Sequence, residues 1–291
     1  MKILQKIDFF SRFYKGSKRY FFSAIGFPPQ IREDVTAVYN FCRFIDDSID
    51  EPFKTEYSFE VISSEYKKAL TTGYSVISLV TEFVRIKKEK GIKDEWVDAL
   101  FNSMLMDKNG RVYNSLEDTL DYAYGVAEVI GLFMCKVLNL PDEAQKTARY
   151  LGRSAQWINF IRDINEDIQL GRQYFPQSDL KKFGLEDLKF ETVRRKPDQF
   201  KGFMELQFGR FEKWVEFGEK GYEFIPKKFK RPIQYATRLD KWKLKVIRKN
   251  PYIVYTKKVD PGFMEFITYL IKIYLPNKRI PRIILGEHSS S

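Results

Sequence analysis

The feature that most limits the fold of this chain is a helical period that recurs along nearly its whole length. Between residues 33 and 49, apolar side chains return every three or four positions, at Val35, Val38, Phe41, Cys42, Ile45 and Ile49. Similar patterns run through residues 59–70, 75–90, 94–106, 115–139, 142–170, 199–223 and 232–248. The sequence has no convincing run of the alternating strand type, and turn signals such as Asn109-Gly110 separate the helical stretches. We therefore predict an all-α, single-domain bundle of helices around a central cavity.

The composition excludes several common kinds of active site. The only histidine is His288, so a Ser-His-Asp triad, a Cys-His dyad or a His-ligated zinc site cannot form inside the fold. Cys42 and Cys135 lie in apolar helical contexts, and we interpret them as buried free thiols of the kind found in a reducing cytosol. Chemistry in this chain must therefore use carboxylates, Arg, Lys, Tyr or a metal held by oxygen.

Charge and hydropathy indicate the expected partners and location. The 50 Lys and Arg residues against 39 Asp and Glu give a formal net charge of +11, which attracts anionic substrates or anionic lipid. No basic block is long enough for a nucleic-acid arm, and no run approaches the ~18–20 apolar residues of a membrane span. The first twenty residues lack the apolar core of a signal peptide. We expect a cytoplasmic protein and set aside 286–291 as a flexible tail or cloning remnant.

Two pairs of aspartates carry the main functional signal. Asp46 and Asp50 are four residues apart, so they share one helix face with Arg43. In the second stretch the polar positions step by three, four and four, at Gln156, Asn159, Asp163 and Asp167. A single Asp-x-x-x-Asp pattern is usually a solvated helix face. Two such pairs, each with an arginine beside it and each within an apolar helix, favour a site instead, because buried carboxylates need a neutralising cation.

The ligand types indicate which cation and which substrate the site binds. Carboxylates without His or Cys suit Mg²⁺, and Mg²⁺ held by few carboxylates usually bridges to a substrate phosphate. A diphosphate is therefore the natural substrate group, and three arginines are candidates to bind its remaining charge: Arg43, Arg162 and Arg172. Since aromatic residues make up 16% of the chain, the rest of a cavity would be apolar, which fits an isoprenoid tail.

The residues around the second pair resemble the long signature of the squalene/phytoene synthase family of isoprenoid synthases. The matching positions, with their spacing intact, are Leu151-Gly152, Gln156, Asn159, Arg162-Asp163, Asp167, Arg172, Tyr174 and Pro176. The first motif also resembles that family, at Tyr39, Cys42-Arg43, Asp46-Asp47 and Asp50. Further similarity lies in Ser17-Lys18, Met106-Asp107 and 122–131, so the resemblance covers about residues 14–255. It implies one isoprenoid synthase domain over 1–285.

The resemblance implies a role for each matching residue. Metal binding falls to Asp46, Asp50, Asp163 and Asp167, with Asn159 as a further candidate ligand. Tyr39 and Arg43 join the four aspartates as catalytic candidates. Substrate binding falls to Ser17, Lys18, Tyr124, Gln156, Asn159, Arg162 and Arg172. Asp47 points about 100° away from Asp46, so it is either a supporting or a structural residue. Tyr174 is interpreted as structural.

Three positions depart from the family pattern. Glu128 stands where a small residue is usual, Arg19 where a second small hydroxyl residue is common, and Asp240 where tyrosine is often found. These departures leave the product open rather than the metal chemistry. Glu128 is interpreted either as a structural acid paired with an arginine or as a substrate contact.

The implied reaction is a head-to-head condensation in two steps. One allylic diphosphate ionises, the second prenyl chain attacks, and the cyclopropyl carbinyl diphosphate that forms ionises again and rearranges. We favour phytoene made from two geranylgeranyl diphosphates without NADPH. The alternatives are squalene or dehydrosqualene from two farnesyl diphosphates and, less favoured, a non-catalytic assembly factor. The second signature argues against a chain-elongating prenyltransferase and a terpene cyclase.

The segment 262–275 leaves one question about partners open. It is apolar on one side, with Lys257-Lys258 before it and Lys278-Arg279 after it. It is either an interfacial helix that makes a peripheral contact with anionic lipid or a final helix packed on the domain. The sequence does not indicate the oligomeric state.

Overall fold

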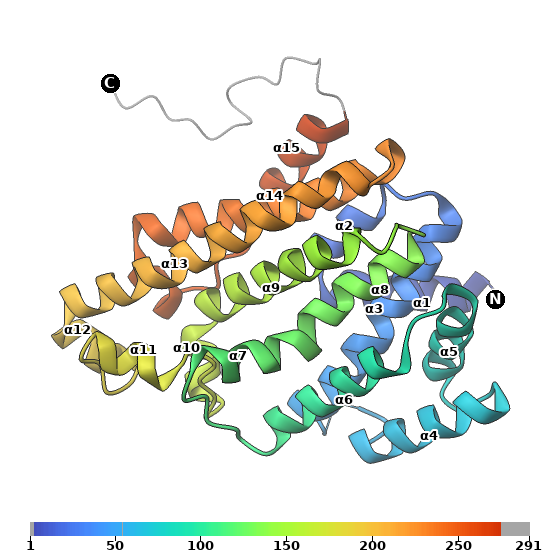
Figure 1. Cartoon of the computed structure of the whole chain (residues 1–291), viewed down its shortest axis with the longest axis horizontal. Helices are drawn as coiled ribbons and strands as arrows, with labels where there is room; N and C mark the ends of the chain where they lie inside the picture. Colours follow the sequence, from blue (N-terminus) through green and yellow to red (C-terminus); the bar gives the residue numbers. More distant parts are fainter. Residues whose placement is uncertain (1–2, 54, 275–291) are drawn as a thin grey trace.

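The computed structural model describes residues 3–53 and 55–274, so the predicted end of the domain at 285 and the tail 286–291 lie outside the described residues. Within that part the chain is helical and contains no strand, which confirms the predicted all-α fold. Figure 1 shows long helices lying side by side, with α9 between α8 and α13. The elements of the first half are α1 (Ile3–Gly16), α2 (Lys18–Ala24), α3 (Pro29–Asp50), α4 (Phe59–Thr72), α5 (Ser78–Lys90), α6 (Asp94–Lys108), α7 (Leu116–Ala123), the π turn η1 (Tyr124–Glu128) and α8 (Val129–Val137). Those of the second half are α9 (Ala144–Arg162), α10 (Ile164–Gln169), α11 (Gln177–Lys182), α12 (Phe190–Arg195), α13 (Pro197–Glu219), η2 (Lys220–Phe224), α14 (Lys227–Lys249), η3 (Pro251–Tyr255) and α15 (Phe263–Tyr274).

Local signals in the sequence set several helix ends. Helix α3 begins at Pro29. The first N–H groups of a helix have no partner within the helix, so the absence of one in proline costs nothing there, and the ring fixes φ near its helical value. The start of α7 is a capping box, in which the Ser115 hydroxyl and the Asp118 carboxylate each accept an N–H from the other's backbone. Helices α4 and α5 end at Gly73 and Gly91, with φ of 77° and 68° that favour glycine.

Two predicted helices contain interruptions that periodicity does not reveal. The stretch predicted at 115–139 turns through η1 between α7 and α8, and π turns of this kind often mark functional sites. The stretch predicted at 142–170 is not one helix, because Asp163 adopts φ −99° and ψ 12° between α9 and α10. The single helix expected from the pattern is therefore divided, and Asp167 sits on the separate short helix α10.

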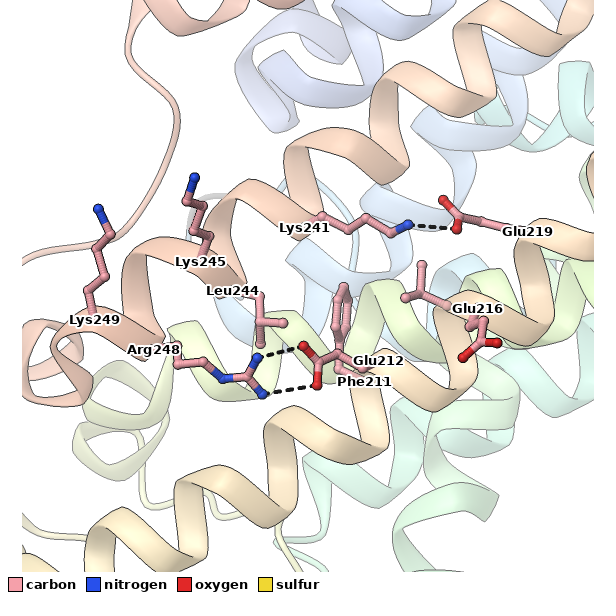
Figure 2. Close-up of a pocket in the computed structure, with 10 residues that line it drawn as sticks. Phe211, Glu212, Glu216, Glu219, Lys241, Leu244, Lys245, Arg248 and Lys249 are labelled. Carbon is pink, nitrogen blue, oxygen red and sulfur yellow. Dashed lines mark hydrogen bonds and ion pairs between the residues drawn. The ribbon is translucent and has the colours of Figure 1, made fainter. Parts of the chain in front are cut away.

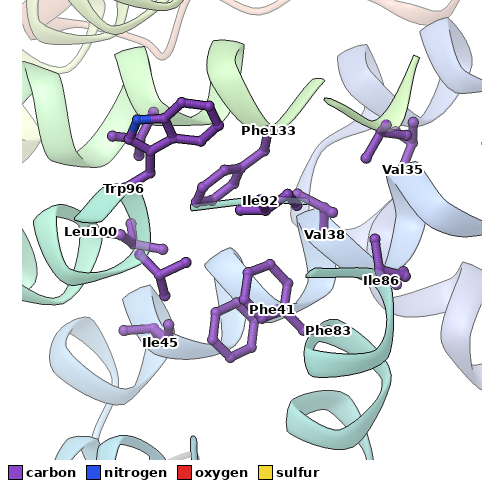
Figure 3. Packing of buried hydrophobic residues seen from close by; sticks show 14 of the residues in the cluster. Val35, Val38, Phe41, Ile45, Phe83, Ile86, Ile92, Trp96, Leu100 and Phe133 are labelled. Carbon is purple, nitrogen blue, oxygen red and sulfur yellow. The ribbon is translucent and has the colours of Figure 1, made fainter. Parts of the chain in front are cut away.

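The hydrophobic core has two main parts, one around α3 and one around α9. The first packs α3 against α4, α5, α6 and α8, and its centre is the stacked pair Phe41 and Phe83, with ring centroids 3.8 Å apart (Figure 3). The second packs α9 against α13, with Trp157 at right angles to Trp214 and 4.9 Å from it. Helices α3 and α9 are thus each packed into an aromatic core, which fixes the position of the aspartate motif that each carries.

Glycines let three helices approach very closely beside η1. A Cβ at Gly125 would lie 2.3 Å from the Ala99 carbonyl oxygen of α6, and one at Gly152 would lie 2.3 Å from the Ala127 carbonyl oxygen. These distances are shorter than any tolerable contact, so only glycine fits at both positions. The π turn is consequently held between α6 and α9.

No helix in the described part of the chain is long and apolar enough to cross a membrane. Helix α15, which covers most of the segment 262–275, contacts α14 and α2. The rings of Phe22 and Phe266 are 5.2 Å apart, and the Tyr235 hydroxyl donates to the Phe266 carbonyl at 3.3 Å. These contacts agree with the packed-helix alternative, and lipid contact stays a prediction. Residue 275 lies outside the described residues.

Candidate functional site

The last turns of α3 carry the first aspartate motif together with its arginine. Arg43 Nη1 lies 2.7 Å from Asp46 Oδ2, and Arg43 Nη2 lies 2.6 Å from Asp47 Oδ1. One guanidinium therefore holds two neighbouring carboxylates by charge-assisted hydrogen bonds. Asp47 is not an isolated charge on the far side of the helix, because Arg43 pairs with it in the same way as with Asp46.

The second motif occupies the break between α9 and α10. Arg162 donates to both oxygens of Asp163, from Nε at 2.7 Å and from Nη2 at 2.5 Å. Its remaining Nη1 donates to Asp260 at 3.0 Å. Asp167 lies one turn further on, on the short helix α10. The guanidinium that the sequence predicts to bind diphosphate is thus fully engaged by two carboxylates.

Arg172 joins the two aspartate motifs in space. Its Nη1 lies 2.7 Å from Asp50 Oδ1, across more than 120 residues of chain. Asp107 on α6 stands beside this pair and accepts hydrogen bonds from the Tyr174 hydroxyl at 2.9 Å and from the Tyr122 hydroxyl. The C-terminal end of α3, the end of α6 and the segment after α10 therefore meet at one end of the bundle, as the prediction of a shared site requires.

Asp107 is the residue that the sequence reasoning missed. Met106-Asp107 resembles the family pattern, but the sequence alone predicts no role for Asp107. Burial raises the pKa of Asp107 above its ordinary value, although the Tyr122 hydroxyl, Arg172 and the Tyr174 hydroxyl oppose that rise. A partly buried carboxylate beside both motifs is a candidate to orient Arg172.

Carboxylates outnumber arginines at this end of the bundle. Burial, followed by Asp50 and Asp47, raises the pKa of Asp46 to about 7 against the pull of Arg43. Burial and Asp163 raise the pKa of Asp167 to about 8 against the pull of Arg172. Because each aspartate penalises the charge of the next, a cation at this end would be strongly favoured.

The carboxylate oxygens of the two motifs are the type of ligand that a hard divalent cation takes. Among the described residues no group of three or more His, Cys, Asp or Glu side chains converges on one point. Arg43, Arg162 and Arg172 each pair with one of the predicted ligands, namely Asp46, Asp163 and Asp50. The oxygen ligands present thus fit Mg²⁺ by ligand type.

The other predicted site residues occupy four different environments. Tyr39 packs against Phe13, with ring centroids 4.3 Å apart, and burial raises the pKa of its hydroxyl. The Ser17 hydroxyl caps α2 by accepting the Tyr20 N–H at 3.3 Å, and the next residue, Lys18, is exposed. Among the described residues, Gln156 and Asn159 are half-buried on α9 and have no side-chain hydrogen bond.

Tyr124 and Glu128 are the first and last residues of the π turn η1. The Arg149 guanidinium lies 5.0 Å from the centre of the Tyr124 ring, which is a cation–π contact. Glu128 is fully buried and accepts Arg149 Nε at 2.8 Å and Arg153 Nε at 2.6 Å. The geometry agrees with the interpretation of Glu128 as a structural acid, since two arginines of α9 satisfy its carboxylate.

A surface groove of about 620 Å³ lies elsewhere, between α13 and α14 (Figure 2). Its floor is Phe211, Val215 and Leu244, with acidic residues of α13 on one side and basic residues of α14 on the other. The ion pairs Arg248–Glu212 at 2.6 Å and Lys241–Glu219 at 2.6 Å cross it. None of the predicted site residues lines this groove, so it does not contribute to the candidate site.

Comparison with known proteins identifies the group to which the chain is similar. The sequence profile of squalene/phytoene synthases matches residues 14–264. The chain is 29% identical to 4,4'-diapophytoene synthase of Staphylococcus haemolyticus over 59% of its own length and 61% of that protein. It is 24% identical to 15-cis-phytoene synthase of Synechococcus elongatus over 83% of each. The matched part is thus less than two thirds of the first relative.

A solved structure gives the fold independently. A dehydrosqualene synthase crystallised with a ligand superposes with a TM-score of 0.81 at 19% identity, over 94% of this chain and 96% of that one. The likeness confirms the helical fold predicted from the sequence. The resemblance drawn from the residues around Asp163 is also confirmed, because the matched profile covers the region that those residues defined.

Proposed function

The chain belongs to the squalene/phytoene synthase family, and from that premise we propose that it joins two prenyl diphosphates head to head. The enzyme class predicted from the sequence, a prenyltransferase, is that of the family. We propose geranylgeranyl diphosphate as both substrates, phytoene as the product and no use of NADPH. The observation that carries the proposal is the meeting of both aspartate motifs through Arg172, Asp50 and Asp107.

The arginines of the site suit the departure of a diphosphate. Arg43, Arg162 and Arg172 bring three permanent charges to the carboxylate end, each on a different element. Charge develops on the leaving diphosphate during ionisation, and fixed donors of this kind stabilise it without proton transfer. The carboxylates Asp46, Asp50, Asp163 and Asp167 would hold Mg²⁺, which when bound neutralises the leaving group.

The aromatic surroundings suit the carbocation that ionisation leaves. Tyr39 of α3 packs on Phe13 of α1, and Tyr124 stands in the π turn between α7 and α8, so aromatic rings lie on both of these elements. Aromatic faces stabilise a cation modestly and exclude water, which would otherwise quench it. Tyr39 and Tyr124 are proposed to line the path of the prenyl chain.

Product analysis tests the proposal directly. The protein is incubated with Mg²⁺ and either farnesyl or geranylgeranyl diphosphate, with and without NADPH, and the extracted hydrocarbons are identified. Phytoene from geranylgeranyl diphosphate alone supports the full proposal. Squalene or dehydrosqualene from farnesyl diphosphate would keep the head-to-head chemistry and replace the substrate. No condensed product from either substrate would contradict the proposal.

A single substitution tests the metal assignment. Asp163→Asn should lower the turnover by at least about a hundredfold, because it removes a charged metal ligand and a partner of Arg162. Asp187→Asn is the matched control. Asp187 is a partly exposed aspartate, and its Oδ2 lies 3.9 Å from Lys189 Nζ. Full activity of Asp163→Asn would show that the assignment of Asp163 is wrong.

A further inference from the structure

Behind the second aspartate motif lies a chain of buried charges that the proposed reaction does not use. Lys243 of α14 is 2% exposed, and its Nζ lies 3.6 Å from Asp260 Oδ1 and 3.8 Å from Asp240 Oδ1. Asp240 also pairs with the buried Arg19 of α2. Asp260 in turn reaches Arg162 at 3.0 Å. The chain of charges therefore runs from α2 through α14 to the arginine of the second motif.

Two of these residues are departures that the sequence revealed separately. Arg19 stands where the resemblance implies a small hydroxyl residue and Asp240 where it implies a tyrosine, and the structure pairs the two in the interior. A buried ion pair of this kind is strongly destabilised when one partner is removed. Arg19 and Asp240 thus neutralise each other, and Lys243 lies between Asp240 and the slightly closer Asp260. Burial, with Arg19 and Arg162, lowers the pKa of Lys243, and Asp260 is the neighbour that most opposes this.

Asp260 differs from the rest of this network because it is accessible. Its side chain is 48% exposed, against 2% for Lys243 and 14% for Arg162. The neighbours Val259 and Pro261 are both buried, so the backbone is anchored on each side while the carboxylate faces water. Burial raises the pKa of Asp260, but Arg162 and Lys243 outweigh it and bring the pKa below its ordinary value, so the carboxylate is charged.

The contacts of Asp260 conflict with the proposed function. The three nitrogens of the Arg162 guanidinium carry five N–H donors. Nε and Nη2 donate to Asp163, and Nη1 donates to Asp260. The Asp260 carboxylate therefore competes with a diphosphate for Arg162 Nη1. The Asp260 side chain is 48% exposed, so it has room on its solvent side to rotate away from Arg162 and from Lys243.

We propose that Asp260 is an internal counter-ion that holds Arg162 and Lys243 in the empty enzyme, and that substrate diphosphate displaces it and recruits Lys243 as an additional anion-binding residue. The proposal rests on the proposed function, since it assumes that Arg162 receives a diphosphate. It adds a residue that the resemblance does not supply and gives the exposed carboxylate a reason to lie among buried cations.

Binding of inorganic diphosphate, measured by isothermal titration calorimetry with EDTA present, tests the proposal without metal and without turnover. Asp260→Asn should bind diphosphate about five- to tenfold more tightly than the wild type, because the cations are no longer occupied. Lys243→Met should bind it about fivefold or more weakly, and the double variant should lose the gain of Asp260→Asn.

Two controls separate a contact effect from a general change of charge. Glu166→Gln removes the same charge from the same region, but Glu166 forms its ion pair with Lys258 at 2.6 Å and acts on Arg162 only through space, without a direct contact. It should change the affinity less than about twofold. Lys241→Met removes a lysine two positions away on α14 that pairs with Glu219 on the surface, and it should leave the affinity unchanged.

An affinity of Asp260→Asn equal to or below that of the wild type would overturn the counter-ion role, and so would an equal gain in Glu166→Gln. Unchanged binding by a folded Lys243→Met would overturn the role of Lys243. Asp260→Asn decides the main point even if Lys243→Met does not fold, because a half-exposed side chain is replaced without opening a cavity. A protein that makes no condensed product but binds diphosphate as described would refute only the proposed function.

Discussion

Replacing Asp46 by asparagine should stabilise the metal-free protein at alkaline pH. The raised pKa of Asp46, about 7 in place of the ordinary 3.8, means that the folded state holds the proton more tightly than the unfolded state does. The stability of the metal-free protein therefore falls as the pH rises from about 4 to about 7, and the loss is complete above that range. Asparagine imitates the protonated form and avoids this loss.

The magnitude follows from the shift and from the exposure of the side chain. A difference of about 3 pKa units corresponds to about 4 kcal/mol at about 1.4 kcal/mol per unit. The Asp46 side chain is 29% exposed, and solvent screening reduces the effect to about 2 kcal/mol. Arg43 keeps its partner Asp47 at 2.6 Å, so the substitution leaves no unpaired guanidinium.

Urea unfolding of the wild type and Asp46→Asn with EDTA, at about pH 4 and about pH 8.5, measures this difference. The variant should be about 2 kcal/mol more stable at the higher pH and within about 0.5 kcal/mol at the lower one. Asp142→Asn on the surface is the control, because Lys136 lowers the pKa of Asp142 and its substitution should not stabilise. A variant no more stable than the wild type at high pH would refute the reasoning.

Three further substitutions have calculable outcomes. Glu128→Gln should lower the free energy of unfolding by urea by about 3 kcal/mol, because it leaves Arg149 and Arg153 without their buried carboxylate. Glu128→Asp should lower it less, and an unchanged stability of Glu128→Gln would contradict the prediction. Gly125→Ala should lower the free energy of unfolding by about 2–3 kcal/mol, since the added Cβ would lie 2.3 Å from the α6 backbone. Gly209→Ala is the control, because a Cβ added at Gly209 would meet no atom within 4 Å. Asp107→Asn should keep the fold by circular dichroism and lower turnover about tenfold, and full turnover would remove Asp107 from the site.

The departures from the family pattern show how much of this protein's structure the sequence left undecided. Each of the three could be seen as unusual in the sequence, but their partners could not be identified. Arg19 and Asp240 are 221 residues apart, and Glu128 pairs with residues 21 and 25 positions away. Sequence spacing predicts contacts within one helix, whereas these pairs depend on how separate helices cross.

The helices and the chemical character of the site followed from local rules. Apolar residues at spacings of three and four predict helices wherever they occur, and capping residues and glycines mark several of their ends. Aspartates four apart share a helix face in any fold, so the carboxylate motifs and their arginines could be recognised without coordinates. The signature around Asp163 narrowed these motifs to one family, and the matched profile confirms it.

The tertiary structure decided which charges meet. It placed Asp107 against the tyrosines of two other segments, carried Arg172 to Asp50 and interrupted the second helix at Asp163. It also brought Asp260 to Arg162 and Lys243, from a loop 98 residues after the motif. The physical reason is that helical periodicity is a property of neighbouring residues, whereas a buried charge is stable only beside a partner, which the packing of the whole bundle supplies.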